Sequence, residues 1–394
     1  MTKPDLDHIR AGMRTHMIAD ESAAVMRLIE TADLSEGDRS AISARAAGLV
    51  RTVRSSSAPT MMESFLGEYG LSTGEGVALM CLAEALLRVP DAETVDDLIR
   101  DKITPHDWSA HQGHSSSIMV NASTWALMLT GRVLDDEEER GIEGTLLSLV
   151  RRLGEPVIRR AVGAAMREMG DQFVLGRNIG EAVKRGRDLI AKGYLYSYDM
   201  LGEAARTAED AERYFDAYAG AIAELARSSN RPDIRHNPGI SVKLSALHPR
   251  YEAVKRETML PEMTERLLAL AKAAKDARMG LNIDAEEADR LDISLDVIER
   301  VLSDPSLEGW DGFGVVVQAY GPRAPFVLDW LHALATKHDR HIMVRLVKGA
   351  YWDSEIKRAQ VMGLPGYPVF TRKTHTDVSY LACARKLLSM TDRI

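Results

Sequence analysis

The stretch GLNIDAEEADRLDISLDVIERVLSDPSLEGWDGFGVVVQAY, residues 280–320, contains the unit from which the second half of the chain is built. Apolar and other residues alternate at 280–285, apolar residues then recur at helical spacing over 292–303, and a second alternating run follows at 314–320. Alternation predicts a strand, and strand, helix and strand in this order predict two parallel strands joined by a crossover helix.

The same pattern extends to both sides of this stretch. Further alternating runs occupy 195–200, 240–246 and 342–347, and helical periodicity follows the runs at 208–228, 261–278, 324–338 and 375–390. Strands that alternate with helices predict a parallel sheet covered by helices. The first run lacks the Gly-x-Gly-x-x-Gly that would follow it in an open dinucleotide-binding sheet. We therefore expect an α/β fold with an incomplete (β/α)8 barrel, five of its eight units being present.

The first half of the chain predicts helices only. Helical periodicity at 21–32 and 36–54 continues through several segments to residue 169, and no alternating run precedes residue 190. The glycines between 176 and 193 suggest a boundary. We expect a helical arm at 1–58, a helical domain at 59–180 and the truncated barrel at 181–394.

Composition excludes several function classes. The 58 acidic side chains outnumber the 50 basic ones, which argues against a nucleic-acid partner, because phosphates attract clustered positive charge. The two cysteines lie far apart, so no metal site is expected. The first residues are charged and polar and do not predict a signal peptide, and no run of about 18 apolar residues predicts a membrane span. We therefore expect a cytoplasmic location, with peripheral membrane association left open.

Polar residues interrupt the predicted strands near their ends. With a period of two, Ser241, Lys243 and Ser245 share one face of their strand. Four successive strands each direct one polar side chain inward near the strand end, and we expect these four side chains to lie in register: Lys243, Asp284, Gln318 and Arg345. Barrel enzymes place their catalytic groups at these strand ends. Burial of an unpaired charge costs roughly several kcal/mol, so charged side chains at these strand ends are unusual. We therefore expect the four residues to form an active site.

Lys348-Gly-Ala-Tyr-Trp352 follows the last predicted strand. A lysine beside a glycine can bind an anion, and the two aromatic rings suit a planar group. The segment therefore favours a flat cofactor that carries phosphate, although a structural turn explains Gly349 and Ala350 equally well.

Four strings along the barrel resemble successive motifs of proline dehydrogenase. They are Ser241-Val-Lys-Leu-Ser-Ala-Leu-His-Pro-Arg250, Asn282-Ile-Asp-Ala-Glu-Glu-Ala-Asp289, Val316-Val-Gln-Ala-Tyr320 and Arg345-Leu-Val-Lys-Gly-Ala-Tyr-Trp352. The segments 75–88 and 98–102 resemble the helical domain that precedes this barrel in proline utilisation A. The chain is thus similar to the N-terminal proline dehydrogenase region of that bifunctional bacterial family.

The resemblance implies an FAD-dependent oxidation of L-proline to Δ1-pyrroline-5-carboxylate, with electrons passed to a quinone at the inner membrane. Asp284 and Arg345 would be catalytic, and Lys243 and Tyr351 would bind the substrate. The cofactor would contact Ala285, Gln318, Arg345, Lys348, Gly349, Ala350 and Trp352. The helical arm would offer a surface for homo-oligomer formation.

The chain departs from this family in two ways. It lacks the later barrel strands, with a Thr-His-Asn motif and a paired Arg-Arg, and it lacks the aldehyde dehydrogenase domain that oxidises glutamate semialdehyde. We therefore expect a piece of a longer protein, and no activity from a polypeptide that ends at Ile394. It also starts without the ribbon-helix-helix domain of some members, so autorepression is not expected.

Two other functions stay open at this point. A barrel lyase could use Lys243 or Lys348 to form a Schiff base with a carbonyl substrate. A third interpretation is non-enzymatic, with the helical half as a scaffold attached to an inert barrel.

Overall fold

The computed structural model describes residues 5–55 and 174–394. One compact unit combines the N-terminal helices up to Ile42 with Gly186–Ile394, and a second unit lies within Ser43–Arg185. The helices expected between residues 59 and 173 fall outside the described residues, and the three-domain division stays a prediction. The first unit carries every candidate site residue.

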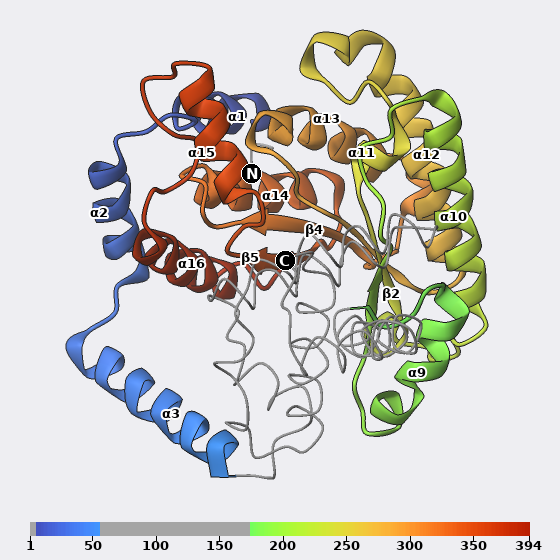
Figure 1. Ribbon diagram of the computed structural model, residues 1–394, viewed down its shortest axis with the longest axis horizontal. Helices are drawn as coiled ribbons and strands as arrows, with labels where there is room; N and C mark the ends of the chain where they lie inside the picture. The colour runs from blue at the N-terminus through green and yellow to red at the C-terminus, as the bar shows by residue number, and fades with distance from the viewer. Residues whose placement is uncertain (1–4, 56–173) are drawn as a thin grey trace, which may run out of the picture. The chain divides into compact units, whose positions relative to one another are not determined.

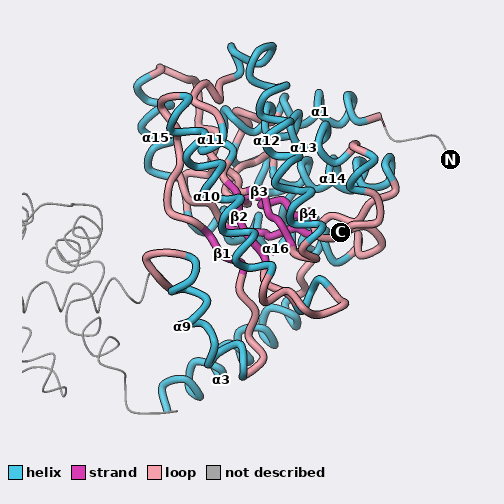
Figure 2. Tube along the Cα trace, turned by 90° about the vertical axis from the view of Figure 1, so that its right-hand side faces the viewer, coloured by secondary structure: helices cyan, strands magenta, loops and turns pink. Residues whose placement is uncertain are grey.

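Five parallel strands form one sheet in the order β1-β2-β3-β4-β5, so each strand pairs with the next along the chain. Their bounds are β1 Ser197–Asp199, β2 Gly239–Val242, β3 Gly280–Ile283, β4 Phe313–Gln318 and β5 Met343–Val347. Helices cover the outside of this sheet (Figures 1 and 2). They are α10 Ala208–Ala226, α12 Arg256–Asp276, α13 Leu291–Leu302, α14 Ala324–His338 and α16 Lys373–Leu388. The predicted α/β class and the five barrel units are confirmed.

The core lies between the strands and these helices. Ile240, Val242, Leu281 and Ile283 alternate with the inward side chains of β2 and β3 and are buried. They pack on the apolar side of the helical layer, where Leu267, Leu270 and Ala274 of α12 are also buried. The period of two thus leaves every second residue of a strand facing the barrel interior.

Three predicted elements need correction. The second strand was expected to continue to Ala246, but it ends at Val242, and Leu244–Leu247 form the short helix α11. The helix expected from residue 261 begins at Arg256, because buried Met259 and Leu260 hold its first turns in place before Pro261. The glycine-marked break at 176–192 contains a helix, α9 (Ile179–Ala191).

Two N-terminal helices of the first unit pack on the barrel. Ala24, Leu28 and Ala32 of α2 (Glu21–Ala32) form a buried cluster with Phe370 and Ala382, the latter from α16. The helix α1 (Leu6–Thr15) was not predicted from the sequence. It packs on α14 and buries Arg10 against Asp292. A third helix, α3, spans Glu36–Ser55 as predicted.

Candidate active site at the carboxyl ends of the strands

The strand register places three of the predicted polar residues in one row. Ser241 aligns with Asn282, Asn282 with Gly314, and Gly314 with Met343. Two residues further along each strand lie Lys243, Asp284, Val316 and Arg345, and the strand pairing aligns Val316 with Arg345. The backbone N–H of Asp284 donates to the carbonyl of Val242 at 2.9 Å, so the ladder continues to this level. Lys243, Asp284 and Arg345 are therefore neighbours inside the barrel.

Gly314 makes room for this interior. A Cβ atom at Gly314 would lie only 1.9 Å from the side-chain oxygen of Asn282. The missing side chain lets Asn282 extend across β4 towards the strand beyond, one level below the row of charged residues. Glycine is required here by close approach and not by its backbone conformation.

Asp284 bridges two cations. Its Oδ2 accepts a hydrogen bond from Nζ of Lys243 at 3.0 Å, and its Oδ1 accepts one from the guanidinium of Arg345. Asp284 is nearly buried, with 9% of its side chain exposed, whereas 40% of Arg345 is exposed. A carboxylate that accepts charge-assisted hydrogen bonds from two cations fixes the positions of both.

Lys243 has a second carboxylate partner. Its ammonium also donates to Asp199, the last residue of β1, at 3.0 Å. Burial alone would lower the pKa of Lys243, but the charges of Asp284 and Asp199 outweigh it and hold this pKa above its usual value. An ammonium carries three N–H donors, so one can still meet a substrate carboxylate. A lysine held in the charged form is a poor amine nucleophile.

Arg345 and Lys243 are oriented by neutral groups as well. The guanidinium of Arg345 donates to the hydroxyl of Ser241 at 3.1 Å. The hydroxyl of Tyr218 on α10 accepts the backbone N–H of Lys243 at 3.2 Å. Burial raises the pKa of Tyr218 to about 12, so this hydroxyl is neutral at ordinary pH.

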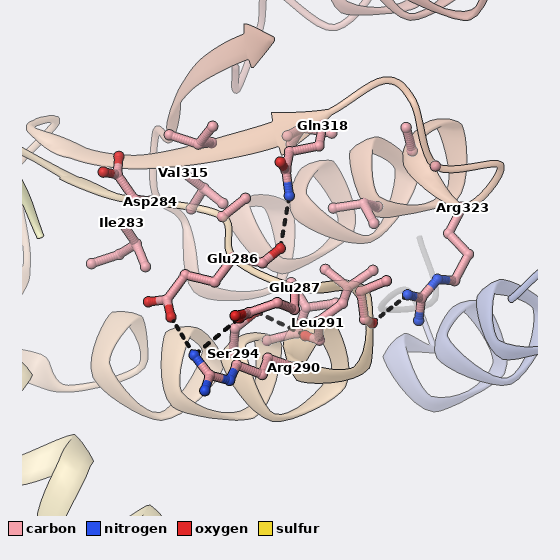
Figure 3. A pocket seen from close by; sticks show the side chains of 18 of the residues that line it. Ile283, Asp284, Glu286, Glu287, Arg290, Leu291, Ser294, Val315, Gln318 and Arg323 are labelled. Carbon is pink, nitrogen blue, oxygen red and sulfur yellow. Dashed lines mark hydrogen bonds and ion pairs between the residues drawn. The ribbon is translucent and has the colours of Figure 1, made fainter. Parts of the chain in front are cut away.

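Gln318 lies outside the charged cluster. It is two residues beyond Val316, one level further along the strands. Its amide nitrogen donates to the carbonyl of Glu286 at 2.8 Å (Figure 3), and its oxygen accepts the N–H of Ala350 at 3.1 Å. Gln318 thus joins the loop after β3 to the turn after β5, and the expectation that four polar groups meet at one level is wrong for this residue.

Ser245 was expected to share the inward face with Ser241 and Lys243, and this expectation is wrong. Because α11 begins directly after Lys243, the period of two ends there. Ser245 is buried, its N–H donates to Oε1 of Glu286 at 3.0 Å, and its hydroxyl accepts the N–H of Ala204 at 3.0 Å. The residue is a link between loops and not part of the charged cluster.

The turn after β5 depends on Gly349. This residue has φ of 141°, and a Cβ atom there would lie 2.3 Å from the ring of Tyr320. Only glycine combines this backbone with such close contact. Lys348 points to Asp377 in the first turns of α16, at 2.5 Å, and Lys373 pairs with the same carboxylate at 3.0 Å. Two exposed ammonium groups therefore lie together beside the turn.

Tyr351 and Trp352 lead into a helix that the sequence analysis missed, α15 (Trp352–Val361). The indole N–H of Trp352 donates to the carbonyl of Phe370 at 2.8 Å, and 40% of Trp352 is exposed. Burial raises the pKa of the half-buried Tyr351, so its hydroxyl is a hydrogen-bond donor at neutral pH. The two aromatic residues thus stand at the barrel end of α15.

A small cavity of about 60 Å³ lies beside the cluster, between the loop after β3 and the segment from β4 into α14. Asp284, Ala285 and Gln318 line it, as do the buried Glu286 and Arg323 (Figure 3). Its size suits water molecules and not a substrate. The charged cluster at the strand ends, and not this cavity, is therefore the candidate active site.

Three contributing carboxylates were not singled out from the sequence: Asp199, Glu286 and Asp377. Glu286 had a usable signal, since two adjacent glutamates directly after a buried strand are unusual. Asp199 is the last residue of β1 and aligns with Ser241, one level before Lys243 and Asp284. Asp377 lies in the second turn of α16, and its pairing with Lys348 depends on the fold.

The described residues give two further negative findings. Within 5–55 and 174–394 no cluster of three or more metal-ligating side chains is present. In the same ranges none of the helices has the length and apolar character needed to cross a bilayer.

Family models match most of the chain. The model described as proline dehydrogenase matches residues 182–394, and that of the proline utilisation A proline dehydrogenase N-terminal domain matches 7–54. A third, described as the DNA-binding domain of proline dehydrogenase, matches 61–173, outside the described residues. In view of that description, the expected absence of a nucleic-acid partner stays an untested prediction.

The chain is also similar to whole proteins. It is 54% identical over 334 residues to the bifunctional protein PutA of Klebsiella aerogenes, covering 85% of this chain and 26% of the relative. It is 49% identical to the bifunctional protein PutA of Salmonella typhimurium, covering 98% of this chain and 30% of the relative. A crystal structure of Bradyrhizobium japonicum proline utilisation A, mutant D779Y, matches with a TM-score of 0.69, 48% identity, and 96% and 38% covered. The chain spans under a third of the length of these curated relatives, and it belongs to the proline dehydrogenase family, matching the N-terminal region of proline utilisation A.

Proposed function

We propose that this chain forms the site at which L-proline is oxidised to Δ1-pyrroline-5-carboxylate with FAD as the electron acceptor. The observation that carries the proposal is the bridge that Asp284 makes between Lys243 and Arg345 at the carboxyl ends of the strands. Family membership supports the coarser statement of a proline-oxidising enzyme.

The cluster suits an amino acid substrate. Lys243 keeps one free donor for the carboxylate of proline, and Asp284 lies beside it, where it can accept a hydrogen bond from the substrate amine. Together the two residues would orient the ring so that its C5 faces the cofactor. Orientation of this kind supplies a large share of the rate enhancement in reactions between bound groups.

The residues around the turn fit a flat cofactor that carries phosphate. Two ammonium groups, Lys348 and Lys373, flank Asp377 and provide positive charge near the exposed ring of Trp352. Arg345 presents a partly exposed guanidinium from the neighbouring strand. FAD held by these residues would supply the acceptor for the hydride that leaves C5 of proline, while the substrate amine loses its proton. Arg345 would stabilise negative charge on the reduced ring.

Quinone reduction at the membrane, the aldehyde dehydrogenase step and assembly through the helical arm are further proposals for the longer protein. A relative named as bifunctional supports the second of them. We also propose a cytoplasmic protein with peripheral contact to the inner membrane, because the reduced flavin must meet a membrane quinone.

The experiment that tests the proposal uses the purified holoenzyme under anaerobic conditions. We expect a flavin absorption spectrum that bleaches when L-proline is added. The lyase alternative predicts the opposite pattern, with no flavin and with substrate trapped on Lys243 or Lys348 by borohydride. The high pKa of Lys243 argues against that alternative, because a Schiff base requires the neutral amine.

A further inference from the structure

The backbone N–H and carbonyl of Ala288 are both held by buried charged side chains. Ala288 lies in the loop that begins at Asp284. Its N–H donates to Oε1 of Glu355 at 2.6 Å, and its carbonyl accepts from the guanidinium of Arg323 at 2.5 Å. Both Glu355 and Arg323 are 4% exposed. Two buried charged side chains thus bind the backbone of a single residue.

These charges are buried at a free-energy cost. Burial raises the pKa of the Glu355 carboxyl and lowers the pKa of the Arg323 guanidinium, so the surroundings disfavour both charged forms. A loop that only connects β3 to α13 needs no such contact, because neutral groups could satisfy the same N–H and carbonyl. The contact therefore indicates that the exact position of this loop matters.

Glu355 links the loop to the residues after β5. It lies in the first turn of α15, and its own N–H donates to the carbonyl of Tyr351 at 2.9 Å. One turn later Arg358 pairs with Asp289 at 2.6 Å, next to Ala288. Two contacts, from Glu355 to Ala288 and from Arg358 to Asp289, thus join the start of α15 to the loop after Asp284.

We propose that Glu355 is a positioning residue for proline oxidation, which sets the distance between the Asp284 loop and Tyr351 at the start of α15. The inference rests on the proposed function, in which Asp284 and Tyr351 contact the substrate from these two segments. Glu355 itself touches the backbone of Ala288 and not the reacting groups.

The test compares three variants of the holoenzyme. Glu355→Ala removes the acceptor, Glu355→Gln keeps an oxygen acceptor without the charge, and Arg10→Met is the matched control. Arg10 is also 4% exposed, and it pairs with Asp292 and Asp296 on the outer side of the barrel. Each variant is characterised by kcat and KM for proline, thermal unfolding, and hydrogen exchange of the peptide that contains Ala288.

We expect Glu355→Ala to lower kcat/KM by about tenfold to a hundredfold, with a raised KM, because misplaced substrate contacts lose orientation. Exchange at Ala288 should become faster, and Glu355→Gln should recover most of both losses. Arg10→Met should lower thermal stability and leave KM and exchange at Ala288 unchanged. A lower folded fraction reduces the amount of active enzyme but not its KM, so the two roles are distinguishable.

An unchanged KM and unchanged exchange at Ala288 in Glu355→Ala would overturn the proposal. If that variant does not fold, Glu355→Asp replaces it, since the shorter side chain withdraws the carboxylate by one methylene and keeps the charge. Wild-type kinetics in Glu355→Asp would equally count against the inference. If the wild type is not reduced by proline, the proposed function fails, whereas hydrogen exchange still decides whether Glu355 holds the loop.

Discussion

The ammonium of Lys243 lies 3.0 Å from a carboxylate oxygen of Asp284, although 41 positions separate the two residues in the chain. The contact exists because β2 and β3 pair in parallel register and both residues directly follow their strands. It places a cation and a carboxylate side by side at the carboxyl ends of the strands.

Loss of the Lys243 charge should weaken substrate binding. We expect Lys243→Met to raise the KM for proline by about tenfold to a hundredfold, since a hydrogen bond to a charged group contributes about 1.5–3 kcal/mol. Steady-state kinetics measure this. Lys386→Met serves as control, because Lys386 pairs with Asp329 on the outer helices. A change in the KM for the electron acceptor, with an unchanged KM for proline, would contradict the assignment.

Arg345 should tune the bound flavin. Removal of its positive charge in Arg345→Met should lower the reduction potential by about 30 mV or more, which corresponds to about 1.4 kcal/mol for two electrons. A spectroelectrochemical titration of the holoenzyme measures this, with Arg256→Met as the control, because Arg256 pairs with Asp296 on the outer helices. A variant with an unchanged potential and normal turnover would rule out the role.

The backbone at Gly349 gives a stability prediction. Gly349→Ala adds a methyl group against the ring of Tyr320 and forces alanine to a φ of 141°, so we expect about 1–3 kcal/mol of destabilisation and weaker flavin retention. Gly220→Ala is the matched control. Gly220 lies within α10 with open space around it, so alanine should stabilise the helix by about 0.5–1 kcal/mol. Equal unfolding temperatures for the two variants would contradict the strain argument.

Glu286 predicts a pH dependence of stability. Burial raises the pKa of its carboxyl above the usual 4.5, because the effect of burial outweighs the opposite effect of the hydrogen bond from Ser245. A raised pKa means that the folded protein binds this proton more tightly, so the contribution to stability is full below about pH 4.5 and is lost as the pH rises through the folded pKa. Glu286→Gln does not titrate. As the pH rises above 4.5, the wild type should therefore lose stability that the variant keeps. The free energy of unfolding of the variant minus that of the wild type should increase.

Urea unfolding at several pH values between 4.5 and 8 measures that difference. Glu252→Gln provides a control, because Glu252 is exposed on the surface beside Arg250. Parallel curves for Glu286→Gln and wild type would show that the buried carboxyl does not titrate as described.

The sequence allowed the strands, the outer helices and the inward face of each strand to be predicted, because these depend on local periodicity. The level of each residue along the barrel depends on strand register, which a single sequence does not contain. For this reason Lys243, Asp284 and Arg345 were correctly grouped, while Gln318 was placed one level too low. Ser245 was misplaced because α11 begins before the alternating pattern ends.

Long-range contacts of single charges were also beyond prediction. Asp377 pairs with Lys348, and Glu355 with the backbone of Ala288, only because helices α16 and α15 return to the strand ends. Helix α15 itself was missed, since the glycines and prolines that follow it, such as Gly363 and Pro365, masked its short periodicity.

The most direct test of the central claim is the single-turnover rate at which L-proline bleaches the flavin in wild type and in Asp284→Asn. The amide keeps the shape of the carboxylate but loses its charge, so both cations lose their shared partner. The account predicts rapid bleaching in the wild type and a rate lower by about a hundredfold in the variant. Equal rates in the two proteins would contradict it.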